Sequence, residues 1–179
     1  MLTTENTLTL VIDFQERMMP SIGDNEQLEK KAAIFLQGSA ILGLPILCTQ
    51  QYTKGLGETT DVIKDAIGNF SHIEKITFSC FGCDEFESKL AAADKKNIFI
   101  TGVEAHICVQ QTVLHLLERD YNVYVLADCV GSRYEQDKKI ALRRMEKAGA
   151  IVTTAESALF EMMVAADHPK RKDISNLVK

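Results

Sequence analysis

Residues 97–113, NIFITGVEAHICVQQTV, carry the strongest signal for the fold. The run 97–102 is apolar enough for a buried strand, and over 106–120 apolar residues recur at helical spacing. A buried strand that passes into a helix through a short turn is typical of folds in which helices connect parallel strands. The turn carries a glutamate, a histidine and then Cys108, which raises the question of why a thiol stands at that junction.

Short apolar runs and longer amphipathic ones alternate along the rest of the chain as well. Strands are predicted at 8–13, 45–49, 72–79, 97–102, 122–130 and 150–154. Helices are predicted at 25–43, 84–94, 106–120, 135–149 and 155–164, with a polar loop at 50–61 and a polar tail at the end. We therefore expect one α/β domain over residues 1–179, a three-layer αβα fold whose six-stranded parallel sheet has the Rossmann-like strand order 3-2-1-4-5-6.

The composition is that of an ordinary globular protein. Of the 179 residues, 46% are hydrophobic and 25% are charged, and the formal net charge is −5. No segment is rich in lysine and arginine, so nucleic-acid binding has little electrostatic support. The first residues lack the pattern of a signal peptide, and no apolar run approaches the roughly 20 residues that span a bilayer. The five cysteines are expected to be reduced thiols in a cytoplasmic protein that does not bind membranes.

Three chemically active residues stand at or beside predicted strand ends, where open parallel sheets bind their ligands. Asp13 follows the first strand, and its carboxylate either works or simply forms a turn. Lys75 belongs to the third strand, where a lysine more often reaches solvent. Cys108 falls in the first turn of a predicted helix, where the unpaired amides favour a thiolate nucleophile, although free cysteines are often small buried hydrophobes.

Other motifs give weaker indications. The four histidines are scattered and do not form a zinc-binding pattern. The spacing Cys80-x-x-Cys83, between a strand and a helix, superficially suits a thioredoxin-like redox pair. The glycines in KGLGETT (54–60) match neither a phosphate-binding loop nor a dinucleotide-binding fingerprint.

Taken together, the chain resembles the isochorismatase-like cysteine hydrolase superfamily. The resemblance rests on LVIDFQERMMPSI (10–22), EKITFSCF (74–81) and ITGVEAHICVQQTVLHLLERDYNVYVLADCVGSR (100–133), followed by ALRRMEKAGAIVTT (141–154). Within that superfamily, TQQYTKGLGETTDVI (49–63) looks like the isochorismatase-domain-containing branch.

The resemblance implies a catalytic triad of Asp13, Lys75 and Cys108. It also implies a cis peptide bond between Val103 and Glu104, with the amides of Glu104 and Cys108 forming an oxyanion hole. In that arrangement Asp13 takes the thiol proton and later activates water, and Lys75 keeps the aspartate ionised.

The expected activity is hydrolysis of a C–N bond in a small amide, ureide or imide-like compound, through a thioester on Cys108. Two other functions stay open. The chain could be a binding or regulatory protein that retains the hydrolase fold, or a thiol redox protein that uses Cys80 and Cys83.

Candidate walls of a substrate pocket are Met18, Tyr52, Phe78, Phe81 and His106, each of which also suits a packing role. Because members of the superfamily usually assemble into dimers or larger rings, the resemblance implies a homo-oligomer. The expected partner is a small-molecule substrate, and no cofactor is expected.

We predict that the protein needs no catalytic metal. Metal-dependent nicotinamidases of the superfamily have an Asp-x-His motif after the second strand, and here Gln50, Gln51 and Tyr52 stand in that place. Purified protein should contain no stoichiometric zinc, iron or manganese by elemental mass spectrometry, and chelators should leave activity unchanged. One metal per chain, lost together with activity, would contradict this prediction.

Overall fold

The computed structural model describes residues 2–179 and contains one parallel sheet of six strands. The sheet order is β3-β2-β1-β4-β5-β6, which confirms the predicted order and fold class. The strands are β1 (Thr7–Ile12), β2 (Ile46–Gln51), β3 (Ile73–Lys75), β4 (Asn97–Val103), β5 (Asn122–Gly131) and β6 (Ile151–Thr153). The α-helices are α1 (Asn25–Ile41), α2 (Thr53–Leu56), α3 (Asp61–Ile67), α4 (Asp84–Ala93), α5 (Gln110–Leu117), α6 (Glu135–Lys147), α7 (Ala155–Met163) and α8 (Arg171–Leu177).

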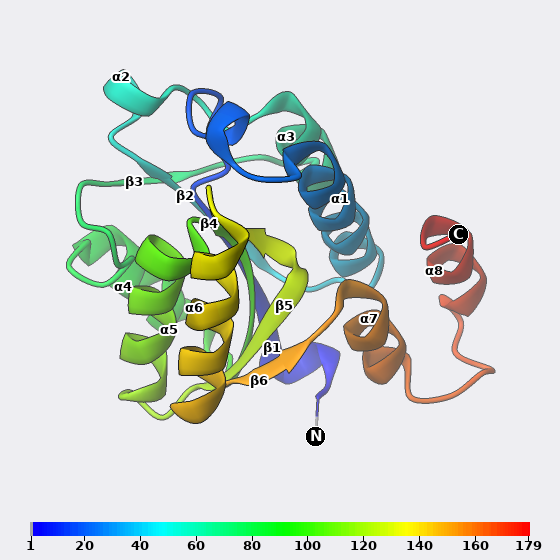
Figure 1. Cartoon of the computed structure of the whole chain (residues 1–179). Coiled ribbons are helices and arrows are strands. Elements are labelled where there is room, and N and C mark those ends of the chain that lie inside the picture. Colours follow the sequence, from blue (N-terminus) through cyan, green and yellow to red (C-terminus); the bar gives the residue numbers. More distant parts are fainter. Residues whose placement is uncertain (1) are drawn as a thin grey trace.

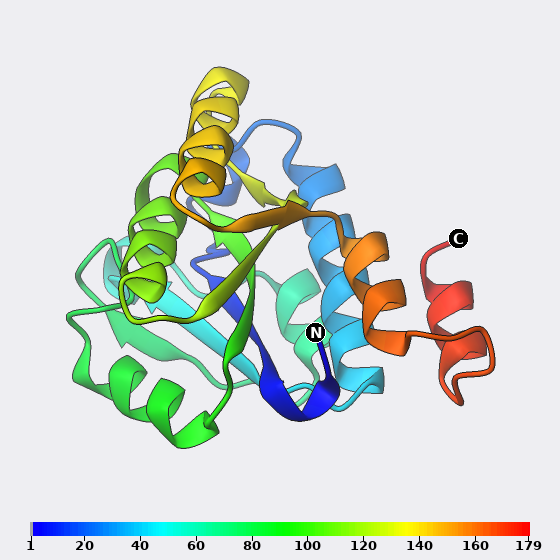
Figure 2. The same cartoon turned by 90° about the horizontal axis from the view of Figure 1, so that it is seen from below.

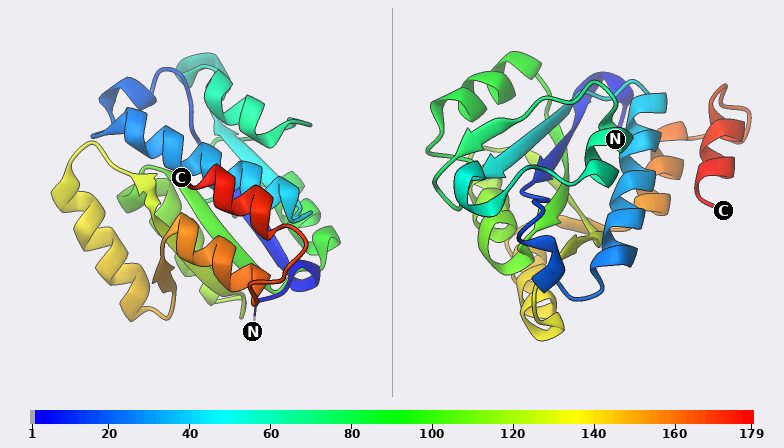
Figure 3. Two further views of the ribbon diagram at one scale, coloured as in Figure 1. Left: turned by 90° about the vertical axis from the view of Figure 1, so that its right-hand side faces the viewer. Right: turned by 90° about the horizontal axis from the view of Figure 1, so that it is seen from above.

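Helices cover both faces of the sheet (Figures 1 and 2). Helices α4, α5 and α6 lie on one face, and α1, α3, α7 and α8 lie on the other. Figure 3 shows α7 and α8 beside α1 on that second face. No helix within the described residues 2–179 combines the length and the apolar character needed to cross a membrane.

The central strands β1 and β4 are buried along their whole length and consist mainly of apolar residues. In β4, Ile98 and Ile100 pack on the side of α4 and α5, whereas Phe99 points to the side of α1. The ring of Phe99 meets the edge of the Phe35 ring with 5.2 Å between the ring centroids. This alternation gives two apolar layers and aligns the strands, so that their carboxyl ends meet along one edge of the sheet.

The observed elements depart from the predicted ones at several places. The predicted strand 72–79 ends at Lys75 because the lysine side chain binds the carbonyls that follow and folds the segment back. The predicted loop 50–61 contains the end of β2 and all of α2, and the predicted polar tail contains α8. Helix α8 gave no periodic signal because Ile174 is the one residue that it buries.

Gly102 allows β1 and β4 to approach each other closely at their carboxyl ends, next to Asp13. Its φ is +141°, and a methyl group added there would lie 2.3 Å from the carbonyl oxygen of Ile12, the partner of Gly102 in the sheet. A side chain at this position would therefore push apart the ends of two central strands.

We expect Gly102→Ala to lower the free energy of unfolding by at least about 2 kcal/mol, because it combines unfavourable backbone geometry with overpacking. The matched control is Gly43→Ala, at φ +76° with no atom within 4 Å of the added methyl group. That control should lose only about 1 kcal/mol from backbone strain. Urea unfolding monitored by circular dichroism measures both, and equal losses would show that the contact with Ile12 is unimportant.

Candidate active site

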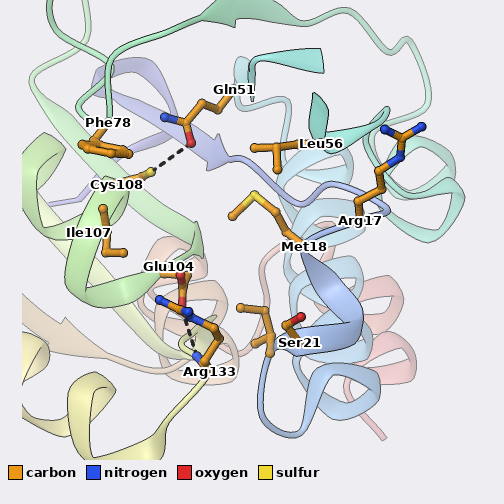
Figure 4. Close-up of a pocket in the computed structure, with 11 residues that line it drawn as sticks. Arg17, Met18, Ser21, Gln51, Leu56, Phe78, Glu104, Ile107, Cys108 and Arg133 are labelled. Atoms are coloured by element: carbon orange, nitrogen blue, oxygen red, sulfur yellow. Dashed lines mark hydrogen bonds and ion pairs between the residues drawn. The ribbon is translucent and has the colours of Figure 1, made fainter. Parts of the chain in front are cut away.

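Four polar side chains gather where the strands end. Asp13 follows β1, Gln51 closes β2, Lys75 closes β3, and Cys108 lies in a π-helical turn, η3 (Ala105–Val109), between β4 and α5. Cys108 and Gln51 face the same cavity (Figure 4). The parallel sheet therefore brings together at one edge side chains that are far apart in the sequence.

Asp13 and Lys75 form a buried ion pair. The distance from Lys75 Nζ to Asp13 Oδ2 is 2.6 Å, and both side chains are fully inaccessible to solvent. The hydroxyl of Thr49 donates to the other carboxylate oxygen at 2.7 Å. Lys75 Nζ also donates to the carbonyls of Thr77 (3.1 Å) and Phe78 (3.0 Å). Both charges thus have the partners that buried ions need.

The protonation of Lys75 is stabilised by its surroundings. Burial by itself favours the neutral amine, but the negative charge of Asp13 and the hydrogen bond to it outweigh burial, and the pKa of Lys75 is raised above 10.5, its ordinary value. Lys75 therefore stays protonated throughout the neutral range.

The thiol of Cys108 is protonated in this environment. Burial is the main cause that raises its pKa, and the negative charge of Asp13 adds to the effect, while the charge of Lys75 opposes it only in part. The expectation of a partly ionised thiol at a helix end does not hold, because burial beside a carboxylate outweighs the amides of the turn. Nucleophilic attack by Cys108 therefore needs a base, and Asp13 is the adjacent one.

The turn before Cys108 exposes backbone donors. The Val103–Glu104 peptide bond is cis. The Glu104 carbonyl accepts hydrogen bonds from the amides of Ile107 (3.0 Å) and Val109 (3.2 Å) but not from the Cys108 amide between them. Among the hydrogen bonds of the described residues, none uses the Glu104 amide as a donor. The Glu104 amide is therefore available to a ligand at the site of the thiol.

The cavity beside Cys108 has a volume of about 320 Å³. Met18, Leu56 and Ile107 supply apolar walls, and Arg17 and Arg133 contribute positive charge. The size and the mixed lining suit a small polar molecule with an apolar part.

Glu104 does not leave a free negative charge in this cavity. Its Oε2 accepts from the backbone amide of Arg133 at 3.0 Å and from Arg133 Nε at 3.1 Å. The Arg133 side chain is half exposed, so this pair closes one end of the cavity at the surface.

Of the five residues predicted to form the pocket walls, two line the cavity and three do not. Met18 and Phe78 line the cavity. Tyr52 is half exposed outside it, and Phe81 is buried in the packing between the sheet and α4. The ring of His106 makes a 2.9 Å hydrogen bond with the hydroxyl of the serine that follows β5. Those three residues belong to the surroundings of the cavity rather than to its lining.

Sequence reasoning missed four polar side chains of the lining, those of Arg17, Ser21, Gln51 and Arg133. Gln51 ends β2, and the two arginines follow the ends of β1 and β5 within a few residues. The rule that ligands bind at strand ends could have identified them.

Cys80 and Cys83 are not joined by a disulfide bond in this structure. Both are free thiols. Cys80 is fully buried, and burial raises its pKa to about 12, whereas Cys83 is partly exposed and donates to the Glu74 carbonyl at 3.5 Å. Within residues 2–179, no group of three histidine, cysteine, aspartate or glutamate side chains is placed to hold a metal ion.

Comparisons with known proteins agree on one family. The family model described as the isochorismatase domain matches residues 7–157. Zebrafish (Danio rerio) isochorismatase domain-containing protein 1 is 38% identical over 93% of this chain, and the chain spans 59% of that protein's length. Zebrafish isochorismatase domain-containing protein 2 is 34% identical over 99% of the chain and 89% of that protein. The structure of the MAR1 ribonuclease from Caenorhabditis elegans aligns with a TM-score of 0.93 at 34% identity, covering 99% of this chain and 91% of that one.

We expect Lys75→Met to lower the free energy of unfolding by about 3–5 kcal/mol, because Asp13 would be left as a buried charge without a partner. The double variant Asp13→Asn with Lys75→Met is the control, and it should recover much of that loss because neither charge remains. Urea unfolding of both single variants and the double variant measures the coupling. Additive effects of the two substitutions would show that the ion pair contributes little.

The same variants test the pH dependence. Since the pKa of Lys75 is higher in the folded state than in the unfolded state, the stabilisation is complete below about pH 10.5 and is lost as pH rises through the folded-state pKa. The double variant should lack this alkaline component.

Proposed function

Because the chain belongs to the isochorismatase family, we propose that it is a cysteine hydrolase that cleaves a C–N bond of a small amide, ureide or imide-like compound. One observation carries the proposal. The buried Asp13–Lys75 pair lies beside the Cys108 thiol, and that thiol lines a cavity of small-molecule size. A base, a cation that keeps it ionised and a nucleophile within reach of a ligand are the parts that covalent hydrolysis needs.

In the first half of the proposed reaction, Cys108 Sγ attacks the substrate carbonyl carbon while its proton moves to Asp13. Because the pKa of Cys108 is raised, mainly by burial, this transfer accompanies the attack rather than preceding it. The C=O electrons move to oxygen, and the amides of Glu104 and Cys108 are the proposed donors to that oxyanion. When the C–N bond breaks, Asp13 returns the proton to the nitrogen, and ammonia or an amine leaves.

In the second half, water adds to the thioester on Cys108. Asp13, again a carboxylate beside Lys75, accepts a proton from the water as its oxygen bonds to the carbonyl carbon. Collapse of this second tetrahedral intermediate breaks the C–S bond, and the proton passes to sulfur. The products are a carboxylic acid and the original thiol, so the cycle closes without any other reagent.

RNA is a second substrate to weigh, because the C. elegans relative is described as a ribonuclease. RNA binding depends chiefly on basic residues that contact phosphates, and this chain has a formal net charge of −5. A cavity of about 320 Å³ with Met18, Leu56 and Ile107 in its walls suits a small molecule better. We therefore keep the small amide as the proposed substrate class.

Self-association is part of the same proposal. Ile76 and Phe78, which follow β3, have exposed fractions of 72% and 54%, and exposed apolar side chains of this size often mark contacts between subunits. Phe78 also lines the cavity, so a neighbouring copy would cover the entrance.

Activity and thiol reactivity test the proposal together. Wild-type protein should release ammonia from at least one member of a panel of small amides and ureides, Cys108→Ser should release none, and Asp13→Asn should be slower by about 10²–10⁴-fold. Cys83→Ser is the matched control and should keep full activity, because Cys83 lies outside the cavity lining.

The alkylation of Cys108 by iodoacetamide should slow in Asp13→Asn, while the partly exposed Cys83 in the same sample reacts at an unchanged rate. Peptide mapping by mass spectrometry reports both thiols at once. Equal rates at Cys108 with and without Asp13 would remove the base from the mechanism. A reactive Cys108 that turns over nothing in the panel would favour the binding-protein function instead.

A further inference from the structure

Gln51 presents an acceptor to the cavity beside the thiol. It is the last residue of β2, it is 9% exposed, and its Oε1 lies 3.9 Å from Cys108 Sγ (Figure 4). The proposed mechanism gives this side chain no task. Its carbonyl oxygen is nevertheless one of the polar atoms nearest to the place where the carbonyl carbon of a substrate would react.

The orientation of the Gln51 amide is set by its other hydrogen bond. Gln51 Nε2 donates to the carbonyl of Ile76 at 3.2 Å, so the oxygen must be the atom that faces the thiol. The side chain cannot turn over without placing two carbonyl oxygens against each other. Gln51 therefore presents a hydrogen-bond acceptor to the cavity and not a donor.

The backbone of Gln51 is equally constrained. The fully buried Gln15 accepts from the Gln51 amide at 2.7 Å and donates from Nε2 to the Gln51 carbonyl at 3.0 Å. The same Nε2 donates to the carbonyl of Gly57 at 2.7 Å. With main chain and side chain both held, Oε1 is a preorganised group that a ligand meets in place.

The Gln51 oxygen has no strong donor within the described part of the chain. Its contact with Cys108 Sγ is a weak thiol hydrogen bond, and during attack the thiol proton leaves for Asp13. A buried acceptor that loses its donor is unfavourable, so a donor supplied by the ligand would stabilise the complex. Once the thiol proton has left, the sulfur and the Gln51 oxygen offer no donor on this side of the cavity, so the N–H of a substrate is the complementary group.

We propose that Gln51 is a specificity-determining residue that accepts a hydrogen bond from the scissile nitrogen of the substrate. The inference rests on the proposed function and narrows it to primary amides, ureides and other compounds that carry an N–H on the leaving nitrogen. The nitrogen is one bond from the carbon that Sγ attacks, so a substrate bound with its nitrogen toward Gln51 brings that nitrogen to hydrogen-bonding distance of an oxygen 3.9 Å from Sγ. Esters and N,N-disubstituted amides offer no proton at that position.

A pair of alkylating probes tests this preference without knowledge of the natural substrate. The probes are iodoacetamide, which has two N–H groups, and N,N-dimethyl-iodoacetamide, which has none. In both, Sγ attacks the CH2 carbon and displaces iodide, so the amide nitrogen lies two bonds from the reacting carbon, one bond further than in a substrate. The ratio of their second-order rates at Cys108, divided by the same ratio for glutathione, should be about three to ten in the wild type, since a neutral hydrogen bond contributes that factor. The ratio is independent of general losses in thiol reactivity, which a purely structural role of Gln51 would produce.

Two variants of Gln51 complete the test. Gln51→Met has nearly the same length but a poor acceptor, and its normalised ratio should fall to about one. Gln51→Glu keeps an acceptor and should keep the preference even if both probes react more slowly. Cys83 in the same samples is the internal reference, because it donates to the Glu74 carbonyl and takes no part in the cavity lining.

The outcomes separate the two proposals. A wild-type preference that persists in Gln51→Met would be steric and would overturn the role of Gln51, while a reactive Cys108 would leave the hydrolase proposal standing. No preference in the wild type would overturn it as well. If neither probe labels Cys108 in the wild type, the thiol is not an accessible nucleophile and the hydrolase proposal itself fails.

Discussion

The buried ion pair between Asp13 and Lys75 is the constraint on which the rest of this site depends. β1 and β3 are not neighbours in the sheet, since β2 lies between them, yet the pair joins their ends at 2.6 Å. A charge without a partner at such a position would be strongly unfavourable, so the ends of both strands are held at one fixed separation. The lysine also binds the carbonyls of Thr77 and Phe78, which places Phe78 in the wall of the cavity.

The same pair determines the state of the thiol. A cysteine at the start of a helix is commonly discussed as a thiolate. Here burial raises the pKa of Cys108, the negative charge of Asp13 raises it further, and the positive charge of Lys75 lowers it by less than Asp13 raises it. The raised pKa keeps the sulfur of the resting protein neutral. Oxidation of cysteine follows its thiolate character, so a protonated, buried thiol is protected from unspecific oxidation.

The fold and the positions of Asp13 and Cys108 could be predicted because they depend on short sequence patterns: an apolar run that forms a strand, and a polar residue that follows it. β1 and β4 are short runs rich in apolar residues, and Asp13 and Cys108 come shortly after them. Other features depend on contacts that no local pattern records. Gln51 gains its orientation from a carbonyl 25 residues further along the chain, and the protonation of Cys108 follows from burial, which is a property of the assembled fold. Helix α8 escaped prediction because a single buried side chain produces no periodicity.

The hydrogen bonds of Gln15 have a consequence for how the cavity can diversify. One buried side-chain amide binds the carbonyls of Gln51 and Gly57, and so clamps both ends of the segment 52–56. Leu56, which lines the cavity, lies inside that segment, whereas the sheet lies outside it. Because both ends of the segment are held by one side chain of the strand-end region, a substitution at Leu56 changes a wall of the pocket while the two anchoring hydrogen bonds of Gln15 remain. The shape of this wall is thus set by a short connecting segment and not by the strands that carry Asp13 and Lys75.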